Sequence, residues 1–221
     1  MAVRQVTPAV VRSVNVGRPR HLEWRGRQVT TAIWKEPVSG AIHVKGVNLE
    51  GDDQADRRVH GGADKAVYAY AAEDYHWWST QLGRLGPGTF GENLTTVGLD
   101  LAASLIGDRW HVGSAILEVS QPRTPCFKLG IRMADDAFPA KFAAAGRTGA
   151  YLRIVQAGLI EAGDQIRLER ATPPLVSIGA LARGELTAGQ LAMLSTDDRV
   201  PEVWRRAAKV ERARQAEHQR S

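Results

Sequence analysis

Short runs of β-branched and apolar residues, separated by glycine-bearing turns, fill the first three quarters of this chain. Runs of this length and composition are typical of β-strands. Two stretches, 73–82 and 135–145, are predicted as helices instead, and 37–40 as a turn. Because many short strands with glycine-rich turns indicate a barrel or a folded sheet, we predict a mainly β fold with inserted helices. The predicted strands cover 5–16, 29–34, 41–47, 66–71, 109–112, 115–119, 150–155 and 165–168.

The pattern changes near residue 171, and the rest of the chain is predicted to be helical at 177–183, 187–193 and 201–215. Thr187 is a suitable N-cap, and Pro201 suits a first helical turn. We therefore predict two domains, a β-barrel-like domain over 1–170 and a small three-helix domain over 171–221 with a basic C-terminal helix. A unit of roughly forty residues rarely has enough core to fold alone. We expect it to dock on the β-domain or on a second subunit, which favours a homodimer.

Composition and charge narrow the class of protein. Of the 221 residues, 43% are hydrophobic and 24% charged, as in ordinary globular proteins. A single cysteine cannot form an internal disulfide, and neither a signal peptide nor an apolar run of about 20 residues is present, so we expect a cytoplasmic protein with no membrane partner. Much of the net charge of +5 lies in 205–220, and RNA-binding signatures are absent. Nucleic acid is therefore not expected as the main partner.

The only cysteine, Cys126, follows a predicted strand. Pro122 and Pro125 have a fixed φ and no backbone donor, so we expect a stiff loop after the strand end. Arg123 and Lys128 lie close in sequence, and nearby cations stabilise a thiolate, the form that attacks electrophiles and binds soft metals. The alternative is an inert cysteine that packs as a small hydrophobic residue.

A polar, glycine-bearing segment contains His60, Gly61, Gly62 and Lys65. Two glycines let a ligand approach the backbone closely. An imidazole can donate a proton, accept one or bind a metal, and a lysine is a point charge suited to phosphate. An ordinary glycine turn with solvated charges explains the same pattern, and the spacing is not that of a P-loop.

Amide and guanidinium side chains could complete a site. Asn93, at the junction of a loop and a strand, can hold a polar ring or a phosphate oxygen, or it can cap its own turn. Arg123, Arg147 and Arg153 can recognise phosphate bidentately. One or two of these arginines are expected to be surface residues or structural ion-pair partners.

Zinc and cysteine-protease sites are less well supported. One cysteine with His43, His60 and His111 lacks the ligand spacing of structural zinc sites. A protease set would use Cys126, His60 and Asn93. However, the cysteine lacks the local signature of those families, and it is predicted to follow a strand rather than to start a helix.

The segments 51–70, 90–96, 106–129 and 149–166 contain the motifs HGGADKAVY and QPRTPC. Together these four segments resemble the MOSC-domain family, named for the C-terminal domain of molybdenum-cofactor sulfurases, and in particular its bacterial YiiM-like branch. They occur in the family's order, and the helical tail resembles the small C-terminal three-helix domain of that branch.

The resemblance implies a β-barrel-like domain that binds the molybdenum cofactor, a pterin dithiolene carrying molybdenum and a phosphate. It implies that Cys126 is the thiolate ligand of the metal, in agreement with the preference of soft metals for sulfur. His60 is the candidate proton donor and, with Cys126, the candidate catalytic pair. The residues expected around the pterin and phosphate are His60, Gly61, Gly62, Lys65, Asn93, Arg123 and Arg153.

The resemblance also implies reduction of N-hydroxylated compounds such as hydroxylaminopurines, amidoximes and hydroxylamines to amines. Reduced molybdenum would accept the oxygen, and a separate redox protein would return the electrons. Trp77 or Trp78 could stack on a purine, although packing within the helix core is the favoured role.

Two other functions stay open. MOSC domains have been proposed as sulfur carriers that hold a persulfide on the cysteine, here Cys126, for delivery to metal–sulfur centres. The second of these functions is that of a non-catalytic binding module whose basic tail contacts nucleic acid. Such a module would bind nucleic acid with a steep salt dependence.

Overall fold

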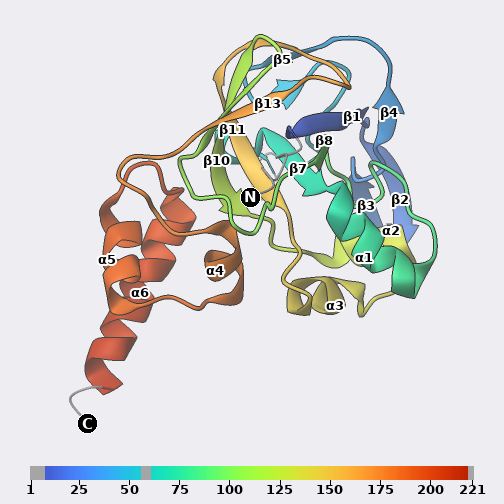
Figure 1. Cartoon of the computed structure of the whole chain (residues 1–221). Helices are drawn as coiled ribbons and strands as arrows, with labels where there is room; N and C mark the ends of the chain where they lie inside the picture. Colours follow the sequence, from blue (N-terminus) through green and yellow to red (C-terminus); the bar gives the residue numbers. More distant parts are fainter. Residues whose placement is uncertain (1–7, 56–60, 219–221) are drawn as a thin grey trace.

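The computed structural model describes residues 8–55 and 61–218 of the chain. An eight-stranded sheet forms its centre, and within this sheet only the β7–β8 pair is parallel (Figure 1). In the order in which neighbours pair, the strands are β13 (Ile166–Glu169), β9 (Arg109–Val112), β10 (Ala115–Pro122), β11 (Ala150–Gln156), β7 (Val67–Ala71), β8 (Leu94–Val97), β1 (Val10–Val16) and β4 (Glu36–Val38).

The remaining strands form two small sheets. One contains β12 (Gly158–Ile160), β5 (Ile42–Lys45) and β6 (Asn48–Leu49), and the other is the hairpin of β2 (Arg20–Trp24) and β3 (Arg27–Thr31). The helices are α1 (Ala72–Leu82), α2 (Phe127–Met133), α3 (Phe138–Ala144), α4 (Ile178–Arg183), α5 (Ala188–Thr196) and α6 (Glu202–His218), with a 3-10 turn η1 (Ala63–Lys65).

The large sheet curls but does not close into a barrel. Strand β1, near one end of the strand order, returns to the start of β13 at the other end. The contact consists of one isolated bridge, Val10–Gln165, and backbone hydrogen bonds such as Val11 N to Asp164 O at 2.9 Å. The sequence prediction is therefore confirmed as a sheet-rich fold with helices, and the expected barrel is corrected to an open, curled sheet.

Strand β7 is buried on both faces because two separate clusters pack against it. Alternate side chains of a strand point to opposite faces. Val67 and Ala69 enter the larger, mainly aliphatic core, while Tyr68 and Tyr70 enter a mainly aromatic cluster. This aromatic cluster includes residues of α1, α2 and α3. The two-sided burial explains why β7 reads as a continuous apolar run in the sequence.

Most local predictions agree with the structure. The strands predicted over 109–112 and 165–168 are present as β9 and β13. Thr187 caps α5 with a full capping box, and the carbonyl of Pro201 accepts from the first turn of α6. Strand β4 overlaps the region predicted as a turn. Pro37 is tolerated in it because β4 is an edge strand, where the missing N–H of a proline costs no ladder hydrogen bond. The helix predicted over 135–145 is confirmed only as α3.

The three helices of the C-terminal segment are present, on the opposite side of the molecule from α1 and α2 (Figure 1). Their buried residues, among them Ile178, Leu191 and Leu194, belong to the same core as Leu117 and Val119 of β10. A separate three-helix domain is therefore not confirmed, and the division at residue 171 stays a prediction. No helix in the described part of the chain has both the length and the apolar character needed to cross a membrane.

The shared core leads to a test with two neighbouring residues of α5. Leu194 is fully buried and Met193 is 41% exposed. We expect Leu194→Ala to lower the free energy of unfolding by about 2–5 kcal/mol, because it leaves a cavity, and Met193→Ala to have a much smaller effect. Denaturant titration should show one transition in both variants. Two transitions, with only one of them shifted by Leu194→Ala, would contradict a shared core.

Candidate functional site

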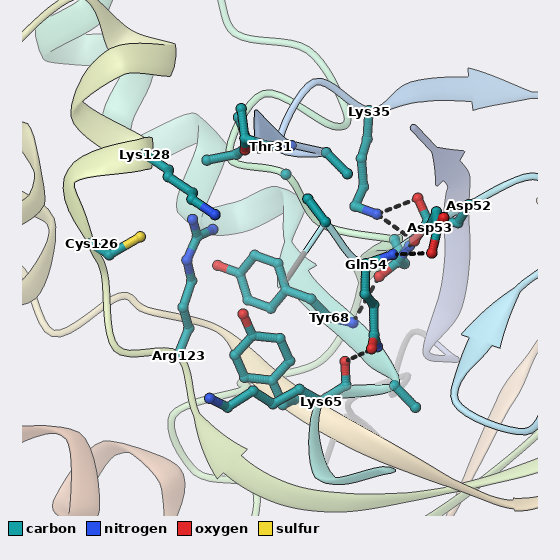
Figure 2. A pocket seen from close by; sticks show the side chains of 17 residues that line it. Thr31, Lys35, Asp52, Asp53, Gln54, Lys65, Tyr68, Arg123, Cys126 and Lys128 are labelled. Carbon is teal, nitrogen blue, oxygen red and sulfur yellow. Dashed lines mark hydrogen bonds and ion pairs between the residues drawn. The ribbon is translucent and has the colours of Figure 1, made fainter. Parts of the chain in front are cut away.

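A pocket lies between the start of α2 and the polar segment 52–55 (Figure 2). Its lining comes from parts of the chain that are distant in sequence: 31–35, 52–55, 65–68, 91–93, 123–128 and residue 151. Cys126, Arg123 and Lys128 lie on one side, and Lys35 and Asp52 lie on the other.

Cys126 occupies the N-cap position of α2 and is half-buried in the pocket lining. Its carbonyl accepts a hydrogen bond from Leu129 N at 2.9 Å. The loop predicted after the strand is short, because β10 runs to Pro122 and α2 begins directly after Cys126. The helix that begins at Phe127 was not predicted from the sequence, because it is short and contains Gly130, a residue of low helix propensity. Cys126 therefore does precede a helix directly, contrary to the sequence prediction, and only the missing local signature is left as evidence against a protease.

Arg123 is a buried cation beside the cysteine. Its guanidinium carbon lies 4.7 Å from the centre of the Tyr68 ring, and Nη1 donates to the carbonyl of Phe90. Its charge interacts with Cys126. No carboxylate in the described part of the chain forms an ion pair with Arg123 or with Lys128. This end of the pocket therefore carries positive charge that the described carboxylates do not neutralise.

The opposite end holds a neutralised lysine. Lys35 Nζ forms an ion pair with Asp52, and both side chains are largely buried. Burial lowers the pKa of Lys35, and the charge of Asp52 opposes that shift. Asp52 also accepts from Gly17 N at 2.8 Å. Sequence analysis missed Lys35, whose only signal was a lysine at the end of an apolar run.

Asn93 lines the pocket, but the protein itself uses its side-chain amide. Oδ1 accepts from Tyr68 N at 3.1 Å. Nδ2 donates to Asp52 Oδ2 at 2.9 Å and to Asn15 O at 3.3 Å. The amide therefore positions the pocket wall, and its Nδ2 has no hydrogen left for a cofactor.

The glycine segment is only partly described. His60 lies outside the described residues, so its predicted role stays a prediction. Gly62, at φ 92°, donates its N–H to Gln54 Oε1 at 3.0 Å, and Gln54 Nε2 donates to Lys65 O at 3.2 Å. Lys65 lines the pocket as expected, whereas Gly61 and Gly62 do not belong to the lining. The glycines thus shape the turn that presents Lys65.

Several predicted residues lie away from the pocket. Arg153, predicted to bind cofactor, is held by Asp64 at 2.5 Å and Glu118 at 3.1 Å, so its charge is already neutralised. Arg147 pairs with Asp74 at 2.5 Å, as one of the expected structural arginines. The two tryptophans of α1, residues 77 and 78, belong to the aromatic cluster, so core packing is confirmed over purine stacking.

Two tyrosines of the pocket were missed because their strand pattern predicts only core. Tyr68 and Tyr151 are cross-strand partners of β7 and β11, with ring centres 5.1 Å apart. Burial raises the pKa of both, so both hydroxyls are protonated at neutral pH. The pattern of large aromatic residues in two strands was the only sequence signal for this wall.

Across the described residues, no group of three or more histidine, cysteine, aspartate or glutamate side chains is close enough to hold a metal ion. The pocket itself offers one soft sulfur ligand, several cations and an aromatic wall. A thiol among cations suits a soft metal together with an anionic group.

Comparison with known proteins identifies the family of this chain. The family model of the MOSC domain matches residues 56–167. An uncharacterized protein of Bacillus subtilis, YflK, is 41% identical over 159 residues, 72% of each chain. A protein of Gibberella moniliformis named a reductase is 33% identical over 172 residues, which are 75% of this chain but 30% of that protein.

The fold agrees as well. The crystal structure of YiiM from Geobacillus stearothermophilus superposes with a TM-score of 0.75 at 29% identity, over 93% of this chain and 100% of that one. Sequence and fold therefore give the same assignment: this chain belongs to the MOSC domain family, whose domains are associated with the molybdenum cofactor.

Proposed function

We propose that this protein binds the molybdenum cofactor in the pocket of Figure 2 and reduces N-hydroxylated compounds to amines. The observation that carries the proposal is the position of the single cysteine beside two cations that lack described carboxylate partners. Family membership and the reductase-named relative support it.

The donor set of the pocket fits this cofactor. The thiolate of Cys126 is the soft ligand that a metal such as molybdenum accepts. Arg123, Lys128 and Lys65 are the cations that suit the dithiolene and phosphate charges. The wall formed by Tyr68 and Tyr151 suits a flat pterin. Arg153 is not part of this proposal, because two carboxylates already pair with it.

The overall reaction is R–NH–OH + 2 e⁻ + 2 H⁺ → R–NH₂ + H₂O. When bound, the cofactor supplies the two-electron redox chemistry. The residues of the chain bind and orient the cofactor and deliver protons. His60 is the proton donor proposed from sequence, and Lys128 is a pocket lysine that can donate beside Cys126.

The partners follow from this reaction. The proposed substrate is a small N-hydroxylated molecule, and a separate redox protein is proposed as the electron donor. A homodimer stays a proposal from the sequence alone, because the described helices of the tail pack on the core of their own chain. The alternative proposal keeps the same pocket but uses Cys126 as a persulfide carrier, for which the cations would stabilise the thiolate.

The first test concerns Cys126. We expect protein purified without oxygen from a host that makes the cofactor to contain molybdenum and pterin, and Cys126→Ser to lose both because a hydroxyl is a poor soft-metal ligand. Mass spectrometry measures the metal, and fluorescence after oxidation measures the pterin. A melting curve checks that the variant folds.

Neither metal nor pterin in the parent protein, even when cofactor is supplied, would refute the proposal. A mass increase of one sulfur atom on the peptide that contains Cys126 would then support the carrier function.

The second test compares two lysines. Lys128 lines the pocket, whereas Lys141 is 61% exposed and pairs with Asp135. We expect Lys128→Gln to weaken cofactor retention roughly tenfold or more, the effect of one charge-assisted hydrogen bond. Lys141→Gln should retain cofactor like the parent. Equal retention in both variants would remove Lys128 from the site.

A further inference from the structure

Glu92 is a fully buried carboxylate with no ion pair among the described residues. Its oxygens accept only from neutral donors: the Tyr75 hydroxyl at 2.7 and 2.8 Å, Gly88 N at 2.6 Å and Thr95 Oγ1 at 2.8 Å. Burial raises the pKa of Glu92, and these hydrogen bonds oppose the rise. Because an unpaired buried carboxylate is costly, a residue of this kind needs all of its donors held in place.

The donors of Glu92 close the loop 86–91. Gly88 N binds the carboxylate, and Gly91 N returns to Gly88 O at 3.0 Å. The Tyr75 hydroxyl donates to Glu92 and accepts from Phe90 N at 3.2 Å. The rings of Tyr75 and Phe90 also stack, with centres 5.0 Å apart. The loop is therefore fixed from both ends by one tyrosine and one carboxylate.

This loop supports the pocket at two places. The carbonyl of Phe90 accepts from Arg123, the buried cation beside the cysteine. On the other side, the loop packs tightly on the pocket segment 33–35. A Cβ atom at Gly88 would lie 2.3 Å from Lys35 O, and one at Gly91 would lie 2.7 Å from Ile33 Cγ1.

We propose that Glu92 and Tyr75 are positioning residues, which hold the Phe90 carbonyl so that the Arg123 guanidinium stays fixed in the ligand pocket. The inference extends the proposed function, because a fixed cation binds an anionic cofactor without losing further side-chain freedom. The contacts themselves do not depend on which ligand occupies the pocket.

Thr95 provides a matched control. It donates to one of the two Glu92 oxygens that Tyr75 contacts and is also buried. Its hydroxyl also accepts from Asn15 Nδ2 at 3.2 Å, but none of its hydrogen bonds reaches Phe90. Tyr75→Phe and Thr95→Val therefore each remove one buried hydroxyl that binds Glu92, and only Tyr75→Phe breaks the link to Phe90.

The test uses nuclear magnetic resonance of the full-length, metal-free protein with ¹⁵N-labelled arginine. The Arg123 side-chain signal is assigned by its absence in Arg123→Lys. We expect a distinct Arg123 Nε–H signal, protected from solvent exchange, in the parent and in Thr95→Val. In Tyr75→Phe this signal should shift or broaden and lose protection. If Tyr75→Phe fails to fold, Glu92→Gln is measured in its place, with the same expectation.

An unchanged Arg123 signal in Tyr75→Phe would overturn the inference, and so would an equal change in Thr95→Val, because the effect would then be general loosening. In the cofactor assay, Tyr75→Phe should retain roughly 2- to 10-fold less cofactor than Thr95→Val, the effect of one hydrogen bond. The spectrum is measured on metal-free protein, so it tests the positioning role of Tyr75 and Glu92 even if no molybdenum binds. Failure of this role is therefore distinguishable from failure of the proposed function.

Discussion

The hydrogen bonds of Asn93 join the parts of the molecule on which the pocket depends. Its backbone pairs with Tyr68 O and Asn15 N at 2.7 Å, and its side-chain amide binds Tyr68 N, Asn15 O and Asp52. Strands β1, β7 and β8 therefore meet at one buried residue. The same amide orients Asp52, which in turn holds Lys35. A polar side chain at this depth is stable only because all its groups are paired, and that pairing fixes one wall of the pocket.

The opposite wall of the pocket contains Arg123, a buried cation that forms no ion pair with a described carboxylate. Arg123 is buried against aromatic rings and a carbonyl. With no described carboxylate beside it, its charge acts on whatever enters the pocket, including the sulfur of Cys126. The two ends of the pocket therefore differ: one is neutralised internally by Lys35 and Asp52, and the other is left to attract an anion.

Sequence alone predicted the parts of this arrangement that are local. The cysteine, with Arg123 and Lys128 near it, was identified because all three lie within six residues, and the N-cap at Thr187 was predicted from a pattern that is equally local. Contacts between distant segments were not predictable. Asp64 and Glu118 neutralise Arg153 across the sheet, and nothing in the sequence reveals these two ion pairs. Asn93 was placed correctly at the pocket, but its three partners come from three other segments.

The proposed function requires molybdenum in the pocket beside Cys126. Anomalous diffraction at the molybdenum edge, from crystals of protein loaded with cofactor, locates the metal. We expect one molybdenum peak within bonding distance of Cys126 Sγ, with the rest of the cofactor density between Arg123 and Lys35. A molybdenum peak elsewhere in loaded crystals, with the pocket free of cofactor density, would contradict the proposed function.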